Sequence, residues 1–434
     1  MKRVEDTKQG AMQELDRKKE IGRFSMEWSE KTFDELFDFL STGTNSRSDL
    51  SLYGDVGYIH YGDIHSKWNK FLDCDKEELP KISKQKVKNL PFLKEGDLIL
   101  ADASEDYVGI GACILLKNVK TRKIVSGLHT ILLRSHNAKL SPVYSAYLTS
   151  IRDVKDKLIS ITTGISVYGL SKNQLKKIKV YLPSDIKEQT TIAQILSDTD
   201  DLIQQIDYLI TKKKNIKQGA MQELLTGKRR LFGFSGKWEV VEIGNHIDLL
   251  TGFPFSSNYY SKNGIRLLRG SNIKRNHIDW SENITEYWEK LTPDLKKYVL
   301  EDGDIVIAMD GSLVGMSFAR LSKKDLPALL LQRVARIRSN SINMDYLKEY
   351  VCSNYFTKYC DSVKTVTAIP HISPKDIRKF SIPVPPTKEE QSAIAKIISN
   401  MDTEIEKLEK NKEKYIMLKN GMMQKLLTGE IRIK

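Results

Sequence analysis

Apolar residues recur at alternating spacings of three and four residues along two long stretches of the chain. The first stretch runs from Ile186 to Gly227, and the second repeats its pattern from Lys388 to Gly429. This spacing predicts a long helix with one apolar seam that packs against a partner helix. Because such helices gain most of their stability from packing, we expect the two copies to pair with each other in antiparallel orientation. A plain coiled-coil dimerisation segment would show the same periodicity, but a duplicated globular segment accompanies the helices and disfavours it.

The end of this helix has a third, partial copy near the start of the chain. Lys8–Leu15 reads KQGAMQEL, which is identical to Lys217–Leu224, and FSMEW from Phe24 matches FSGKW from Phe234. We expect an N-terminal helix over residues 1–23 that packs where the second long helix ends and so completes the repeat. A helix that only caps the first globular segment is the alternative.

Each long helix is preceded by a globular segment, called a head below, and the heads share a set of short motifs. Both contain a Gly-Asp pair followed by an apolar run, LKEGDLILAD from Leu93 and LEDGDIVIAMD from Leu300. A glycine-aspartate turn before branched apolar residues predicts a loop that enters a buried strand. Both heads end in a predicted short helix and strand, LSKNQLKKIKVYLP from Leu170 and ISPKDIRKFSIPVP from Ile372.

These patterns predict an α+β protein with a pseudo-two-fold internal repeat. Two tandem globular α/β heads are expected to be separated by two long antiparallel coiled-coil-like helices. The expected division is an N-terminal helix, head 1, helix 1, head 2 and helix 2, at residues 1–23, 24–184, 185–230, 231–386 and 387–434.

Composition narrows the choice of partner. The 434 residues are 40% hydrophobic, enough for more than one core, and the formal net charge is +13. This charge favours a polyanionic partner such as nucleic acid. An anionic membrane surface is the alternative, but it usually requires a basic block beside an apolar anchor. We find no apolar run long enough to span a bilayer and no signal-peptide pattern, so we expect a cytoplasmic protein.

The chain shows no motif for catalysis, a metal or a cofactor. It has no GxxxxGK[ST] phosphate loop, and its GIG at Gly109–Gly111 is better explained as a strand kink or tight turn than as a cofactor loop. The four cysteines are scattered and the seven histidines form no zinc motif. Acid-x-Lys triplets are too abundant for any one to indicate a nuclease. We therefore expect a protein that is not an enzyme, with no catalytic residue, no metal and no cofactor.

Polar residues do gather in matched segments of the two heads. Arg, Asn and Ser side chains hydrogen-bond base edges, whereas Lys and Arg also hold phosphates. In head 2, GIRLLRGSNIKRNH from Gly264 offers Arg266, Arg269, Ser271, Asn272, Lys274, Arg275 and Asn276. In head 1, GYIHYGDIHSKWNK from Gly57 offers His60, Tyr61, His65, Lys67, Trp68 and Asn69. A solvated polar loop is the alternative for each single residue, but the matched segments favour recognition of DNA.

A second matched pair lies late in each head, just before the short helix. ISITTGISVYGLS from Ile159 offers Thr163, Ser166 and Tyr168, and SVKTVTAIPHIS from Ser362 offers Thr365, Thr367 and His371. Such loops could meet phosphates through the helix N-terminal amides, although Ser and Thr there are commonly N-caps. In a third pair of segments, Arg47 of head 1 and Tyr259, Tyr260 and Lys262 of head 2 could touch the DNA backbone, although tyrosines near a glycine are equally good anchors of a loop.

In the order of these motifs, the whole chain resembles the specificity (S) subunit of type I restriction-modification systems. The resemblance is carried by KEQTTIAQIL and KEEQSAIAKII at the helix starts, by the QELLTG and QKLLTG endings, and by three motifs of head 2. Those are LTGFPFSSNYYSKNGIRLLRGSNI, GDIVIAMDGS and IPHISPKDIRKFSIPVPP. Head 1 departs from the family pattern, with YGDVGYIHYGDIH and GDLILADAS at the corresponding places.

The resemblance implies a role and a set of partners. Each head would be a target-recognition domain that reads one half of an asymmetric, split site in double-stranded DNA. The long helices would set the spacing and dock two methyltransferase (M) subunits, which methylate adenine N6 with S-adenosylmethionine, while restriction (R) subunits add ATP-driven translocation and cleavage. A stand-alone two-headed DNA-binding regulator and a coiled-coil scaffold that binds proteins are the alternatives.

Overall fold

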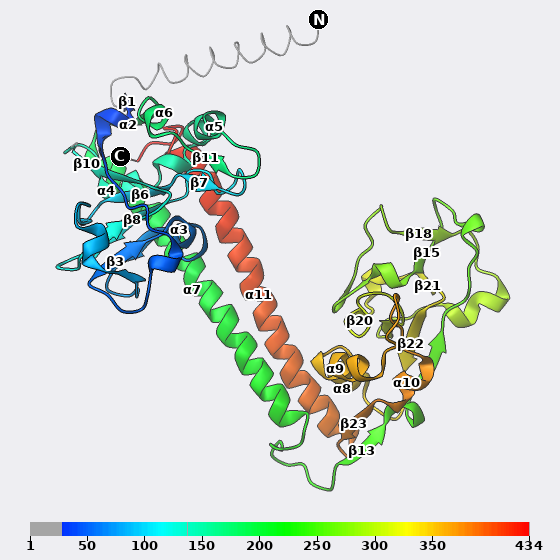
Figure 1. The fold of residues 1–434 in the computed structure, drawn as a ribbon. Helices are drawn as coiled ribbons and strands as arrows, with labels where there is room; N and C mark the ends of the chain where they lie inside the picture. The colour runs from blue at the N-terminus through cyan, green and yellow to red at the C-terminus, as the bar shows by residue number, and fades with distance from the viewer. Residues whose placement is uncertain (1–27, 137, 434) are drawn as a thin grey trace, which may run out of the picture. The chain divides into compact units, whose positions relative to one another are not determined.

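The computed structural model describes residues 28–136 and 138–433, which form two compact units (Figure 1). Unit 1 comprises the chain up to Asp207 together with Lys410–Lys434, and unit 2 comprises Tyr208–Glu409. Each unit therefore contains one head, part of helix α7 (Ile186–Leu224) and part of helix α11 (Lys388–Leu426). The expectation of a helix over residues 1–23 falls outside the described residues.

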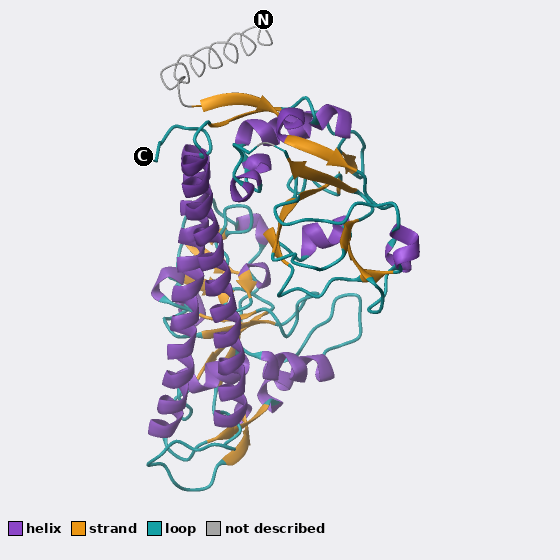
Figure 2. Cartoon of the chain, turned by 90° about the vertical axis from the view of Figure 1, so that its left-hand side faces the viewer, coloured by secondary structure: helices purple, strands orange, loops and turns teal. Residues whose placement is uncertain are grey.

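Helices α7 and α11 run antiparallel, side by side, as the two apolar seams predicted (Figures 1 and 2). In unit 1, Asp200 of α7 forms an ion pair with Lys419 of α11. In unit 2, Lys217 of α7 pairs with Asp402 of α11, with 2.5 Å between Lys217 Nζ and Asp402 Oδ1. The two pairs occupy the same positions of the sequence repeat with the helices exchanged. The buried seam positions are Ile192, Leu196, Ile206, Ile210, Ile394, Ile398 and Ile405.

Each helix ends in a left-handed glycine that packs on a tryptophan. Gly227 has φ +70° and Gly429 has φ +76°, a conformation that favours glycine at a helix C-terminus. A Cβ at Gly227 would lie 3.3 Å from the ring of Trp238, and one at Gly429 would lie 3.2 Å from the ring of Trp28. This contact explains why the LLTG ending and the tryptophan motif recur together in the sequence. In unit 1 the glycine and the tryptophan come from opposite ends of the chain.

The head of unit 1 is built on a five-stranded sheet of order β2-β10-β6-β8-β4 and a three-stranded sheet of order β5-β3-β9. Two short pairs, β1–β12 and β7–β11, complete it. The strands are β1 (Trp28–Thr32), β2 (Phe37–Leu40), β3 (Val56–Ile59), β4 (Lys70–Asp73), β5 (Lys81–Ile82), β6 (Leu98–Ala101), β7 (Ala103–Ser104), β8 (Cys113–Lys117), β9 (Ile124–Ser126), β10 (Thr130–Ser135), β11 (Tyr168–Gly169) and β12 (Lys179–Pro183). The short helices are α2 (Phe33–Leu36), α3 (Tyr61–Ser66), α4 (Pro142–Ser145), α5 (Arg152–Ser160) and α6 (Lys172–Leu175).

The head of unit 2 has a four-stranded sheet of order β14-β22-β19-β20, a three-stranded sheet of order β18-β15-β21, and the pairs β13–β23 and β16–β17. The strands are β13 (Glu239–Glu242), β14 (Asp248–Thr251), β15 (Ile265–Leu268), β16 (Ile273–Lys274), β17 (His277–Ile278), β18 (Glu286–Trp288), β19 (Ile305–Ala308), β20 (Phe318–Arg320), β21 (Ala328–Leu330), β22 (Val334–Arg338) and β23 (Ser381–Val384). The helices are α8 (Met344–Val351), α9 (Asn354–Val363) and α10 (Pro374–Lys379).

The Gly-Asp motif leads into the fully buried strands β6 and β19, as predicted. Asp97 accepts hydrogen bonds from the Lys94 amide at 2.8 Å and from Arg134 at 2.8 and 2.6 Å. Asp304 accepts the equivalent bond from the Glu301 amide at 2.8 Å, and Arg338 donates to it at 2.5 and 2.8 Å. The buried carboxylate is therefore fully paired, and it closes the turn at the start of the strand in both heads.

The main core of each unit is shared between its head and the helices. In unit 1, Ile192 and Leu196 of α7 and Leu426 of α11 join the head in one buried cluster. In unit 2, Leu224 of α7 and Ile394 of α11 do the same. The helices therefore hold each head through apolar packing as well as through ion pairs. Within the described residues, we find no helix with the length and apolar character needed to span a membrane.

Candidate nucleic-acid interface

In unit 1, the loop after β6 contacts both polar segments of this head, the one that contains α3 and the one that precedes α6. Strand β7 lies in this loop and pairs with β11, so that Ser104 is opposite Tyr168. On the other side, His65 of α3 has its Nε2 2.8 Å from the Ala103 carbonyl oxygen. Helix α3 and the loop before α6 therefore meet at the carboxyl end of β6, although many residues separate them in the sequence.

Aromatic side chains line this meeting point. The Tyr107 and Tyr168 rings lie 4.4 Å apart, and Tyr61 has its ring 5.3 Å from the ring of His129. His129 Nδ1 lies 3.2 Å from an oxygen of Asp102. We define the unit 1 face as Tyr61, His65, Asp102, Tyr107, His129, Thr163, Ser166 and Tyr168. Its rings, hydroxyl groups and imidazoles are groups that stack on bases or hydrogen-bond to them.

Unit 2 has an equivalent meeting point after β19. Asp310 forms a β-bridge with His371, and the Gly311 amide donates to the Pro370 carbonyl at 3.0 Å. Thr365 Oγ1 lies 3.0 Å from His371 Nδ1 and 3.2 Å from Thr367 Oγ1. The second polar segment of this head therefore folds into a closed loop against the end of β19.

The first polar segment of unit 2 reaches the same place through the turn η6 (Gly270–Asn272). A Cβ at Gly270 would lie 3.8 Å from Oδ1 of Asp310, and Arg333 Nε lies 3.8 Å from Oδ2 of the same carboxylate. Arg269, which precedes the turn, pairs with Glu286 at 3.4 Å and stays about one third exposed. We define the unit 2 face as Arg269, Ser271, Asp310, Arg333, Thr365, Thr367 and His371.

The structure gives several candidate residues of unit 1 a structural role. His60 is only 6% exposed and caps α3, with Nδ1 accepting from the Gly62 amide at 3.2 Å. Burial, together with the charge of Arg47, lowers the pKa of His60. Arg47 and Lys67 both pair with the fully buried Asp63, at 3.1 and 3.0 Å. Their cations offset that buried charge, which explains their positions without DNA.

Two further candidates of unit 1 point toward the core and the helices. Trp68 is half-buried against the apolar cluster between the sheets. Asn69 donates from Nδ2 to Asp200 of α7 at 3.5 Å, so it belongs to the contact between head and helix. Trp68 and Asn69 therefore have structural contacts of their own, and the expectation that they read DNA stays a prediction.

In unit 2, Asn272 and Arg266 are also held by the fold. Asn272 is completely buried, and its side chain accepts from the Arg269 amide and donates to the Asp279 carbonyl, both at 3.0 Å. Arg266 donates to the Lys324 and Pro327 carbonyls at 3.2 and 3.4 Å, and its guanidinium lies 4.5 Å from the centre of the Trp280 ring. Both residues therefore have structural roles in the head, and contact of either one with DNA stays a prediction from the sequence.

The remaining candidates of this segment lie around the β16–β17 turn. Lys274 Nζ donates to the Ser271 carbonyl at 2.9 Å, and Arg275 donates to Asn354 Oδ1 at 2.5 Å while lying over the Phe318 ring. Asn276 is exposed with φ +65°. These three residues are not part of the unit 2 face as defined above, and their contact with DNA stays a prediction.

The structure adds residues that the motifs did not indicate. Asp102, Tyr107, His129, Asp310 and Arg333 join the two faces, and only the Gly-Asp strand motif hinted at the two acids. A single residue in a short connection carries no periodicity, so no pattern could have selected His129 or Arg333. The loop tips also present exposed apolar side chains, with Ile165 95% exposed.

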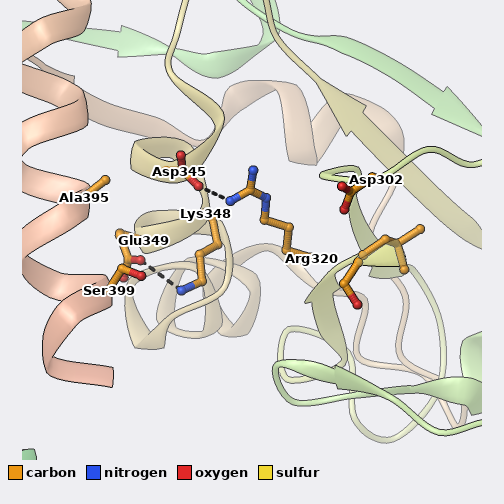
Figure 3. A pocket seen from close by; sticks show the side chains of 9 residues that line it. Asp302, Arg320, Asp345, Lys348, Glu349, Ala395 and Ser399 are labelled. Carbon is orange, nitrogen blue, oxygen red and sulfur yellow. Dashed lines mark hydrogen bonds and ion pairs between the residues drawn. The ribbon is translucent and has the colours of Figure 1, made fainter. Parts of the chain in front are cut away.

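A charged cavity of about 400 Å³ lies elsewhere in unit 2, between the head and α11 (Figure 3). Lys348 and Glu349 of α8 form an ion pair of 3.0 Å beside Ser399 of α11, and Lys348 lies 3.9 Å from Asp402. Glu349 is only 4% exposed, and burial raises its pKa despite the nearby lysine. This cavity therefore belongs to the contact between head and helix.

The raised pKa of Glu349 predicts a pH-dependent cost in stability. A carboxyl with a raised pKa in the folded state binds its proton more tightly there than in the unfolded chain, so stability falls as pH rises from the ordinary value of 4.5 through the folded pKa. Glu349→Gln should therefore have the same melting temperature as the wild type at pH values below 4.5. At pH values above the folded pKa of Glu349, the variant should melt at a higher temperature than the wild type. Melting curves of both proteins across this range would test this, and a wild type that is more stable at neutral pH would contradict it.

The described residues hold no group of three His, Cys, Asp or Glu side chains suited to a metal ion. All four cysteines are buried, and burial raises the pKa of Cys74 to about 11 and that of Cys360 to about 12. The Cys74 and Cys360 thiols are thus poor nucleophiles at neutral pH. The two faces offer donors, acceptors and stacking surfaces, which are the means of binding a ligand.

Comparisons with known proteins show the family of this chain. The family of the type I restriction modification DNA specificity domain matches residues 26–217 and 235–415. The type I restriction enzyme MjaVIII specificity subunit of Methanocaldococcus jannaschii is 31% identical over 79% of this chain and 81% of its own length. The MjaIX specificity subunit of the same organism is 22% identical over 95% and 96%. The crystal structure of the type I restriction-modification S subunit from M. genitalium has a TM-score of 0.58 and 14% identity, covering 93% of this chain and 96% of that one. The protein belongs to the type I restriction-modification DNA specificity family.

Proposed function

We propose that this chain is the non-catalytic DNA specificity subunit of a type I restriction-modification complex, and that each unit reads one half of a split target. The observation that carries this proposal is the presence of two faces at equivalent places, each at the carboxyl end of a buried Gly-Asp strand. Their side chains differ, with aromatic rings and histidines in unit 1 and arginine, threonines and histidine in unit 2. Because different side chains select different bases, the two half-sites should differ in sequence.

The two helices supply the second part of the proposed function. Because α7 and α11 each run without interruption through residues of both units, they are suited to fix the spacing between the half-sites. Their exposed polar residues would dock two M subunits, which methylate adenine N6, and R subunits would join for restriction. The net charge of +13 supports a DNA duplex as the ligand. We place this complex in the cytoplasm, where it would meet incoming DNA.

The function is tested by a methylome. The chain and its M subunit are co-expressed in a host that lacks adenine methylation, and N6-methyladenine is then mapped in the genomic DNA. We expect one split motif with a fixed gap, which disappears when this chain is omitted. Methylation that ignores this chain would contradict the proposal. Specific DNA binding without an M subunit would instead favour a stand-alone regulator, and negligible DNA binding would favour a protein scaffold.

Nonspecific affinity gives a second, simpler test. Each phosphate contact releases bound counterions, so the logarithm of the affinity should fall linearly with the logarithm of the salt concentration. Titrations of a fluorescent random-sequence duplex at several salt concentrations measure this slope. A slope near zero would remove duplex DNA as the ligand of the basic surface.

A further inference from the structure

Two residues outside the sequence-predicted segments occupy the same position in the two units. In unit 1, β10 pairs with β6 so that Thr130 is opposite Ala101, and the residue before Thr130 is His129. In unit 2, β22 pairs with β19 so that Val334 is opposite Ala308, and the residue before Val334 is Arg333. His129 and Arg333 are therefore equivalent by strand register.

The backbone hydrogen bonds repeat around these two residues. The His129 carbonyl accepts from the Asp102 amide at 3.0 Å, and the Arg333 carbonyl accepts from the Met309 amide at 2.9 Å. We call the second polar segment of each head, which precedes α6 or α10, the late polar loop. At the end of this loop in unit 1, the Leu170 amide donates to the Asp102 carbonyl. In unit 2, the Ile372 amide donates to the Met309 carbonyl in the same way. Each residue thus sits where the buried strand, its neighbour and the late polar loop meet.

Both residues adopt a backbone conformation that favours glycine. His129 has φ +55° and Arg333 has φ +71°. For a residue with a Cβ this left-handed conformation is uncommon, and here it recurs at the same register position of both heads. Neither unit places glycine there, although glycine adopts this conformation without the steric cost of a Cβ.

Both side chains are exposed and oriented by an acid of the same face. His129 is 51% exposed with Nδ1 3.2 Å from Asp102, and Arg333 is 60% exposed with Nε 3.8 Å from Asp310. An acceptor on Nδ1 turns Nε2 of the imidazole outward, and a contact through Nε turns the terminal guanidinium nitrogens outward. Those outward atoms are the ones that hydrogen-bond base edges, and guanine O6 and N7 suit the two terminal nitrogens of an arginine.

We propose that His129 and Arg333 are equivalent specificity-determining residues, each contacting a base edge in the half-site read by its own unit. This inference rests on the proposed function and deepens it. Asp102 and Asp310 act as positioning residues that hold the two side chains ready for the base. The exchange of histidine for arginine at one shared position is one source of the difference between the half-sites.

The test uses the complex of the full-length chain with its M subunit and the motif found in the methylome. Methylation rates are measured on duplexes that carry the motif or a single base-pair change at each position. Arg333→Gly should lower discrimination at a position of one half-site by about 5- to 150-fold, the effect of losing one bidentate base contact. His129→Gly should lower discrimination in the other half-site only, by a smaller factor because an imidazole makes a single hydrogen bond.

Stability separates this role from a structural one. Because glycine adopts the left-handed conformation without the steric cost of a Cβ, both glycine variants should melt at the same temperature as the wild type or higher. Lys120→Gly is the matched control, since Lys120 has φ +48°, is exposed and pairs with Asp75 away from the unit 1 face. Lys120→Gly should leave unchanged the ratio of methylation rates on the motif duplex and on each duplex with a single base-pair change. Arg333→Lys keeps the charge and a side chain, and it should lose discrimination while keeping affinity for random-sequence DNA.

Three results would overturn the inference. One is an unchanged preference at every motif position in both glycine variants. Another is a uniform loss of rate on all duplexes, which would indicate a phosphate contact. The third is equal recognition by Arg333→Lys and the wild type. In each of these cases the wild-type chain would still direct methylation to a split motif, so the proposed function would stand. If the wild-type chain directed methylation to no motif, the proposed function itself would be wrong.

Discussion

Replacing Arg230 by methionine is expected to lower the free energy of unfolding of unit 2 by about 3–5 kcal/mol, the range for breaking a buried ion pair. Arg230 donates through Nε and Nη2 to the two oxygens of Glu390, at 2.9 and 2.8 Å. The Glu390 side chain is fully buried. Without the guanidinium, the carboxylate would stay uncompensated in the core or take up a proton, and both outcomes cost stability.

The double variant Arg230→Met with Glu390→Leu is the control. Because it removes both charges, it should recover most of the lost stability. Chemical denaturation of the full-length chain measures the free energies, and hydrogen exchange of unit 2 peptides assigns the loss to that unit. A single variant as stable as the wild type would contradict the assignment. So would a double variant less stable than the single one, since that would mean that contacts other than the charge pair dominate.

The same pair exists in unit 1, where Arg432 donates to Glu188 at 2.6 and 2.7 Å. Arg432 follows α11 as Arg230 follows α7, so the repeat places each arginine beside the start of the other helix. We expect Arg432→Met to destabilise unit 1 by a similar amount.

Replacing Arg269 by alanine is expected to weaken recognition of one half-site by about 1–3 kcal/mol, the range for one direct base contact. Arg269 lies on the unit 2 face, and its pair with Glu286 leaves it about one third exposed. The ratio of methylation rates on the cognate duplex and on its single base-pair variants measures this loss.

Arg266→Ala is the matched control, because Arg266 lies in the same segment and has the same chemistry. Its guanidinium donates to two backbone carbonyls and stacks on Trp280, so its loss should lower the melting temperature without altering base preference. If Arg266→Ala altered the preferred base and Arg269→Ala did not, the division of this segment into structural and DNA-facing residues would be wrong.

The sequence by itself determined the repeated architecture of this protein. Helix α7 and helix α11 follow from an apolar seam that is periodic over many residues, and such a pattern allows only one face to be buried. The buried strands β6 and β19 follow from a glycine-aspartate turn before an apolar run. Local chemistry decides how these strands begin, because the backbone amide that donates to Asp97 or to Asp304 belongs to a residue of the same motif.

Only the tertiary structure decided which polar residues of these segments face outward. Arg266 and Arg269 are alike in sequence, yet one is fixed on Trp280 and the other stays on the face. Asn272 has a side chain suited to a base edge, but partners distant in space consume its hydrogen bonds. His129 and Arg333 reach the faces through strand register, a long-range property that no local pattern encodes. Periodicity determines what is buried over a whole element, whereas the direction of a single polar side chain depends on partners that only the folded chain supplies.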